Sequence, residues 1–164
     1  MKLKFYEALY DDMREVASIY NEFLSSLRDL TADEYFDFKD LEVEKREELL
    51  KERMAKDQGK VLLVKDEDMK GEIVAFISFS IIDCFLIVSS VKQIGYIDGA
   101  YVKEAYRGKG ILRELEKMAS ASLRDMGIKY LELNTLAKNI MANEAWEKLG
   151  YRVFRQQWRK RINE

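Results

Sequence analysis

The chain has 164 residues, of which 48% are hydrophobic and 35% are charged, and its net charge is −2. This size and composition fit one folded domain over residues 1–164 and argue against a disordered chain or a membrane protein. The chain has no histidine and a single cysteine, Cys84. These counts exclude histidine-dependent catalytic triads, histidine-ligated zinc, Cys-rich zinc sites and a disulfide within the chain. We therefore expect no metal site, and chemistry that depends on carboxylates, amines, hydroxyls and backbone amides.

Charge is distributed unevenly along the chain. Residues 29–48 carry nine acidic and three basic side chains, whereas residues 151–161 carry five basic and no acidic ones. The slightly acidic net charge argues against nucleic acid as a partner. The most apolar stretch, residues 73–88, is shorter than the ~20 residues of a membrane helix, and no apolar signal segment follows the first four residues. We expect a cytoplasmic protein with no membrane partner.

The hydrophobic pattern of the first half predicts strands and two helices. A strand over 3–8 precedes a helix whose first turn has Asp12 and Glu15 at the spacing of a capping box. Apolar residues at helical spacing define the buried face of that helix: Met13, Val16, Ala17, Tyr20, Phe23, Leu24 and Leu27. A charged helix is predicted over 41–56. Two buried strands follow over 61–64 and 73–82, and residues 85–91 would extend the second of them into a hairpin.

The second half continues the alternation of strands and helices. Strands are predicted over 94–103, 128–135 and 151–162. Helices are predicted between them, over 108–126 and 139–149. The helix over 108–126 has an apolar face and ends at Gly127, where glycine is preferred. Together the elements predict an α/β (α+β) fold with a mixed, mostly antiparallel central sheet and helices on both faces.

The segment Arg107-Gly108-Lys109-Gly110, between a predicted strand and a predicted helix, has the composition of a phosphate-binding loop. Its two glycines let the backbone approach a ligand closely, and the free N–H groups of the following helix face an anion. Arg107 and Lys109 add positive charge. The spacing is not that of a Walker A loop, and Arg113 breaks the GxGxxG pattern of a dinucleotide-binding fold. The alternative is a glycine-containing turn that only begins the helix.

Three segments in this order resemble the GNAT superfamily of acyl-CoA-dependent N-acetyltransferases. Residues 96–102 (YIDGAYV) are similar to the family's central fourth strand, and residues 107–111 (RGKGI) to its pyrophosphate loop. Residues 139–151 (NIMANEAWEKLGY) are similar to its Asn-x-x-Ala…Tyr-x-Lys-x-Gly-Phe signature. The resemblance covers residues 94–155, and it implies a GNAT-type fold, acetyl-CoA as co-substrate and N-acetyl transfer.

The resemblance also implies which residues hold the co-substrate: Ala100, Tyr101, Val102, Arg107, Gly108, Lys109, Gly110, Ile111, Leu112, Arg113, Asn139, Ala142 and Trp146. The backbone at 100–102 would bind the pantetheine arm and polarise the thioester carbonyl. Asn139 would bind the arm from the other side, cap the short helix, or do both. Two positions depart from the family pattern. Leu112 replaces a loop glycine or alanine, and Trp146 replaces a tyrosine that often protonates the departing thiolate, which an indole does not do at neutral pH.

Asp98 is the predicted general base. The acceptor amine must lose a proton to attack, and without histidine a carboxylate on the central strand is the group available to take it. Many polyamine-type members of the family carry a glutamate at the matching position. Strict alternation places Asp98 on the face of Ala100 and Val102, whereas a bulge at Gly99 would re-aim it. The alternative is a carboxylate with no catalytic role.

The sequence indicates the acceptor less specifically than the co-substrate or the general base. Tyr35 and Phe36, in the acidic segment, are expected to line its site, the alternative being a solvated helix face. The preferred acceptor is a small primary amine (a polyamine, an amino acid or another metabolite) that attacks directly in a ternary complex. The alternatives are a peptide or protein N-terminus or lysine, and a non-catalytic acyl-CoA-binding or sensing domain. The basic final segment would border the 3′-phosphate of coenzyme A or the seam of a homodimer.

Overall fold

The computed structural model describes residues 1–39, 41–56 and 59–162. The chain forms two compact units, Met1–Asn134 and Thr135–Glu164. A single domain over residues 1–164 therefore stays a prediction. No helix in the described part of the chain is long and apolar enough to cross a membrane.

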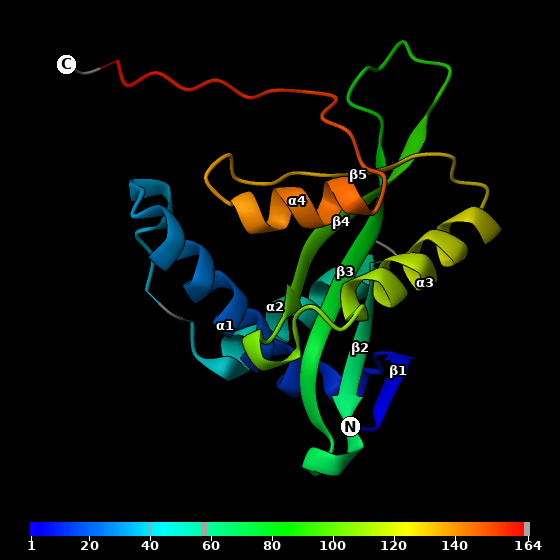
Figure 1. Cartoon of the computed structure of the whole chain (residues 1–164). Coiled ribbons are helices and arrows are strands. Elements are labelled where there is room, and N and C mark those ends of the chain that lie inside the picture. Colours follow the sequence, from blue (N-terminus) through cyan, green and yellow to red (C-terminus); the bar gives the residue numbers. More distant parts are fainter. Residues whose placement is uncertain (40, 57–58, 163–164) are drawn as a thin grey trace. The chain divides into compact units, whose positions relative to one another are not determined.

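The first unit is built on one five-stranded sheet. Its strands, in spatial order, are β1 (Leu3–Glu7), β2 (Lys60–Asp66), β3 (Glu72–Asp83), β4 (Gln93–Val102) and β5 (Leu131–Leu133). The first four strands pair antiparallel with their neighbours, and β5 pairs parallel with β4. Helices α1 (Met13–Thr31) and α2 (Val43–Lys56) pack on one face, and α3 (Ile111–Asp125) packs on the other (Figure 1). The predicted fold class is confirmed.

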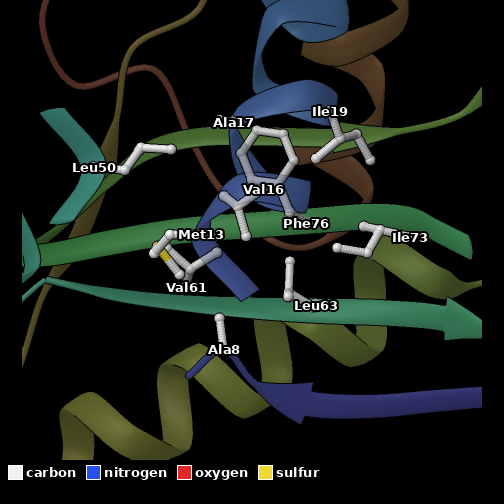
Figure 2. Close-up of a cluster of buried hydrophobic side chains, with 10 residues drawn as sticks. All are labelled: Ala8, Met13, Val16, Ala17, Ile19, Leu50, Val61, Leu63, Ile73 and Phe76. Carbon is white, nitrogen blue, oxygen red and sulfur yellow. The ribbon is translucent and has the colours of Figure 1, made fainter. Parts of the chain in front are cut away.

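The core under α1 joins the buried face of that helix to β2 and β3 (Figure 2). Met13, Val16 and Ala17 of α1 have no exposed surface, as their helical spacing predicts. They lie over Phe76, which is also fully buried. The Phe76 ring stacks on Tyr20 at a centroid distance of 5.3 Å and meets the edge of Phe23 at 5.8 Å. These aromatic contacts fix α1 on β3.

Phe76→Ala is expected to lower the free energy of unfolding by about 3–5 kcal/mol, because it removes a fully buried ring and leaves a cavity. Chemical denaturation monitored by circular dichroism measures this change. Ile87→Ala is the matched control, since 90% of the Ile87 side chain is exposed and its loss should cost less than about 0.5 kcal/mol. Equal effects of the two substitutions would contradict this description of the core.

The start of α1 differs from the predicted capping box. The Asp12 carboxylate makes no cap to α1 and instead accepts a hydrogen bond from the backbone N–H of Leu9 at 2.8 Å. It also accepts from the Tyr6 hydroxyl and from Lys65. Asp12 therefore closes a 3-10 turn over Tyr10–Asp12 rather than pairing with Glu15, so the capping-box prediction was wrong.

Two strand predictions are wrong. Residues 85–91 do not form a strand but the loop of the β3–β4 hairpin, which the bond from the Cys84 N–H to the Lys92 carbonyl closes at 2.8 Å. Residues 151–162 are irregular instead of forming the predicted final strand. Five like charges on residues 151–161 repel one another and leave the segment without a sustained apolar face.

The second unit contains one helix, α4 (Ile140–Lys148), among its described residues. Asn139 precedes it as the N-cap, and its side chain accepts a hydrogen bond from the Ala142 N–H at 3.2 Å. Trp146 is buried, and its ring meets that of Tyr151 edge to face at a centroid distance of 5.2 Å.

Candidate functional site

The loop between β4 and α3 has the backbone conformation that its glycines allow. A 3-10 turn, Glu104–Tyr106, leads into it. Gly108 and Gly110 have φ values of +73° and +78°, in the left-handed region that favours glycine. A Cβ atom at either position would meet nothing within 4 Å, so the backbone itself forms the exposed surface of the loop.

The backbone N–H groups of residues 108–113 form a continuous row of free donors. Within the described part of the chain, they have neither a backbone acceptor nor a capping side chain. The first hydrogen bond at the start of α3 runs from the Glu114 N–H to the Gly110 carbonyl at 3.2 Å. Ile111 is 3% exposed and anchors this first turn in the core, whereas Arg113 is exposed. The free donors and the positive end of the helix dipole together form a site for an anion.

Two cations are held beside these donors by the loop's own backbone. Arg107 donates from Nε to the Val102 carbonyl at 3.0 Å, and its guanidinium lies 5.9 Å from the Tyr101 ring centroid. Lys109 donates from Nζ to the Ala105 carbonyl at 2.9 Å. Both predicted cations therefore stay close to the loop, where they add to its attraction for a polyanion.

Strand β4 loses its β5 neighbour part-way along. The β4–β5 pairing covers Gly95 to Ile97, so among the described strands the segment 98–102 pairs with β3 only. The Lys103 N–H bonds to Val74 on β3 at 2.9 Å. By alternation the Tyr101 N–H also faces β3, and the N–H groups of Ala100 and Val102 face the open edge. Free backbone donors thus continue from the loop onto the strand.

A β-bulge in the same strand positions Asp98. Ser78 pairs with Gly99 and the next residue, Phe79, pairs with Ile97, which leaves Asp98 as the extra residue. A Cβ atom on Gly99 would lie 3.3 Å from the Phe23 ring, so Gly99 faces α1. The bulge places two successive residues, Asp98 and Gly99, on the α1–α2 side of the sheet.

The Asp98 carboxylate is nearly enclosed, with 10% of its side chain exposed. It accepts a hydrogen bond from the Ser80 hydroxyl at 3.2 Å and forms an ion pair with Arg53 of α2. A pocket of about 20 Å³, the size of one water molecule, lies against it. This pocket, here named the Asp98 pocket, is lined by Tyr20, Leu50, Arg53, Met54, Gly59, Lys60, Val61, Ser78, Phe79 and Asp98.

Tyr20 forms part of the wall of the Asp98 pocket. Burial raises the pKa of its phenol, although the nearby Arg53 works in the opposite direction. The guanidinium of Arg46 lies 5.6 Å from the Tyr20 ring centroid. Tyr20 therefore stays a neutral phenol beside a carboxylate and two guanidinium groups.

Sequence reasoning missed Arg53, Ser80 and Tyr20 as site residues. Arg53 belongs to the helix that the sequence predicts only as charged. A signal was present, because Arg53 lies between Leu50 and Met54, which have the spacing of a buried helix face, and a cation within such a stripe needs a partner.

The predicted acceptor residues Tyr35 and Phe36 lie elsewhere. They belong to a 3-10 turn, Glu34–Phe36, and 72% of Tyr35 is exposed. Neither residue lines the Asp98 pocket. The structure does not bring them together with Asp98.

The remaining predicted co-substrate residues lie in the second unit. The side chain of Asn139 is engaged as the N-cap of α4, and Ala142 supplies the N–H that it accepts. Trp146 is 8% exposed. In the described residues no group of three or more Cys, Asp or Glu side chains is arranged to hold a metal ion.

Comparison with known proteins places these features in a family. The model of the acetyltransferase (GNAT) family matches residues 18–151. No curated protein shows significant sequence similarity to the chain.

Solved structures share the fold at low sequence identity. Glucosamine-6-phosphate N-acetyltransferase from Arabidopsis thaliana superposes with a TM-score of 0.71 at 20% identity, over 99% of this chain and 100% of that one. An aminoglycoside 6′-N-acetyltransferase from Acinetobacter baumannii gives 0.77 at 11% identity, over 99% of both chains. A predicted acetyltransferase with acetyl-CoA from Clostridium acetobutylicum gives 0.75 at 14% identity, over 98% and 97%.

Proposed function

The chain belongs to the GNAT acetyltransferase family and is an acyl-CoA-dependent N-acetyltransferase, and from this premise we propose that it acetylates a small-molecule primary amine with acetyl-CoA. The observation that carries the proposal is the row of free N–H groups at residues 108–113, flanked by Arg107 and Lys109. A row of donors at a helix N-terminus, with cations beside it, suits the pyrophosphate of coenzyme A.

The geometry of the first unit fits the rest of the co-substrate. The open edge of β4 offers the N–H groups of Ala100 and Val102 to the amide groups of a pantetheine arm. One of these donors would also stabilise negative charge that develops on the carbonyl oxygen during transfer. Bound there, acetyl-CoA would supply the acetyl group as a thioester, whose carbon–sulfur bond breaks as the carbon–nitrogen bond forms.

Asp98 is the proposed proton acceptor. An alkylamine has a pKa of about 10 and is almost entirely protonated at neutral pH, so it must lose a proton before it attacks. The bulge in β4 places Asp98 beside a pocket, and Ser80 orients its carboxylate from the buried side. The carboxylate takes the proton from the amine and passes it to solvent.

A small acceptor is favoured over a peptide. The structural neighbours named above act, by their names, on glucosamine-6-phosphate and on aminoglycosides, which are small amines. The Asp98 pocket has the volume of about one water molecule and is partly closed by Arg53. Such a pocket suits the end of a small molecule, although Arg53 must move for the amine to enter.

The proposal predicts that the purified protein releases free thiol from acetyl-CoA faster when an acceptor amine is added. The measurement uses small amines and short peptides at pH 7 and pH 9, with the amine-free hydrolysis rate as background. Release with small amines alone is the expected result. Release with peptides alone would replace the small acceptor by a peptide. Saturable acetyl-CoA binding without release for any amine would favour the sensing domain instead, for which burial of Trp146 at the usual tyrosine position gives a reason.

A further inference from the structure

The charges around the Asp98 pocket do not match a cationic acceptor. Among the residues that the structure describes, its lining has two cations, Arg53 and Lys60, and one anion, Asp98. Lys60 is engaged by Glu7 at 3.1 Å, whereas Arg53 bonds to the pocket's own carboxylate. The Arg46 guanidinium lies over the Tyr20 ring of the pocket wall. A polyamine would bring a second ammonium group toward guanidinium groups and be repelled by them.

Arg53 is placed where an incoming molecule meets it first. Forty per cent of the Arg53 side chain is exposed, against 10% of Asp98. Arg53 is therefore the more accessible member of the ion pair. A guanidinium carries five N–H donors, more than one carboxylate can accept from, so Arg53 can bind a second anion.

The ion pair also opposes the proposed role of Asp98. While the ion pair is formed, the guanidinium occupies the carboxylate that would take the proton from the amine. An anion on the acceptor would compete for Arg53, draw it away from Asp98 and open the pocket to the amine. One group on the substrate would then provide both binding and activation of the base.

We propose that the acceptor carries an anionic group, a carboxylate or a phosphate, within a few bonds of its amine, and that Arg53 binds this anion in exchange for Asp98. The short spacing follows because the Arg53 side chain reaches Asp98 from α2, so an anion bound by Arg53 stays within the reach of one side chain from an amine at Asp98. This inference rests on the proposed acetyl transfer and narrows its acceptor from small amines in general to anionic ones.

Four small primary amines test the proposal, and three of them share the ethanolamine core. Ethanolamine has no anion, serine adds a carboxylate to it, O-phosphoethanolamine adds a phosphate, and putrescine carries a second cation. The expected result is that serine, O-phosphoethanolamine or both give a kcat/KM at least tenfold above ethanolamine, with putrescine below it. The two anionic compounds distinguish a carboxylate from a phosphate. The proposal would be overturned if the kcat/KM for ethanolamine and putrescine equalled or exceeded that for serine and O-phosphoethanolamine.

Arg53→Gln removes the guanidinium and should bring the ratio of anionic to neutral acceptor close to one, whereas Arg53→Lys should keep part of the preference. Arg14→Gln is the matched control, because Arg14 is an exposed arginine paired with Glu44 away from the pocket, and it should keep the wild-type ratio. A wild-type ratio in Arg53→Gln would also overturn the proposal.

Calorimetry separates this proposal from the proposed function. If no amine releases thiol, acetyl transfer to these acceptors fails, and titration of serine and O-phosphoethanolamine into the CoA-saturated protein still tests the anion site. Binding that is lost in Arg53→Gln but kept in Arg14→Gln supports the site. Absence of binding to the wild-type protein, or binding independent of Arg53, contradicts it.

Discussion

Asp98→Asn is expected to lower the rate of acetyl transfer at pH 7 about 100-fold or more, which is the usual contribution of a general base. The substitution keeps the shape of the side chain and its contact with Ser80 but removes the charge and the ability to accept a proton. The steady-state rate of thiol release measures the effect. It should appear mainly in kcat, because the proton is transferred in the reaction rather than on binding.

The pH dependence distinguishes a base from a structural carboxylate. Below a pH of about 10 the free amine is mostly protonated and needs a proton acceptor, whereas above it the amine is already neutral. The deficit of Asp98→Asn should therefore shrink as the pH rises from 7 toward 10. A structural role would lower the rate by a similar factor at every pH.

Two controls accompany this substitution, because it also removes the ion-pair partner of Arg53. Asp83→Asn neutralises an exposed carboxylate at the end of β3 and should leave the rate unchanged. Asp98→Glu keeps the charge and should recover part of the rate. A pH–rate profile of Asp98→Asn parallel to that of the wild-type protein would remove Asp98 as the base.

The sequence predicted the elements that a local residue pattern identifies. Helical spacing of apolar residues located α1 and α3. The apolar face predicted for α3 consisted of Ile111, Leu115, Met118, Ala119, Ser122 and Leu123, and it includes the four residues of α3 that are buried, Ile111, Leu115, Ala119 and Leu123. Gly127 ends α3 with a φ of +78°, as glycine after a helix does. The loop was predictable for the same reason, since Gly108 and Gly110 permit conformations that other residues rarely adopt.

The parts that were missed depend on partners far away in the sequence. A strand exists only if a neighbour pairs with it, and the hydrophobicity of residues 151–162 does not show whether one does. The same applies to Asp12, whose carboxylate accepts a hydrogen bond from Lys65, a residue 53 positions away, as well as from Leu9. Arg53 is separated from Asp98 by 45 residues of sequence, so only the folded chain brings the guanidinium to the carboxylate.

The bulge at Asp98 depends on both local sequence and distant partners. Gly99 indicated that β4 could accommodate an irregularity, but its position is set by the pairing of β3 with β4, which shifts between Ser78 and Phe79. The side chains of Phe23 and Phe76 then leave little room for a larger residue at 99, since a Cβ atom would lie 3.3 and 3.4 Å from their rings. The glycine therefore made a bulge possible, and the pairing and packing of the strand decided where it forms.

Arg107→Glu is expected to weaken acetyl-CoA binding about 100-fold, because it replaces a charge-assisted contact with repulsion, and each 1.4 kcal/mol changes the affinity tenfold. The Arg107 guanidinium is held beside the free N–H groups of residues 108–113 by its bond to the Val102 carbonyl, so reversal of its charge acts on the anion site itself. Isothermal titration calorimetry measures the dissociation constant. Added salt should weaken the wild-type complex more than that of the variant.

The loop could bind the pyrophosphate through its charges, through its backbone N–H groups, or through both. A second substitution tests the backbone alone. Gly110→Val leaves every charge in place, but a β-branched residue strongly disfavours the left-handed conformation at φ +78°, so the first turn of α3 must shift. Both variants should bind acetyl-CoA more weakly, whereas the control Arg124→Glu, at the opposite end of α3, should bind it as the wild-type protein does. Weakening by Arg107→Glu alone would mean that coenzyme A is attracted by charge without using the free N–H groups. Unchanged binding in both variants would place the pyrophosphate outside this loop, and the row of free donors at residues 108–113 would then need a different anion.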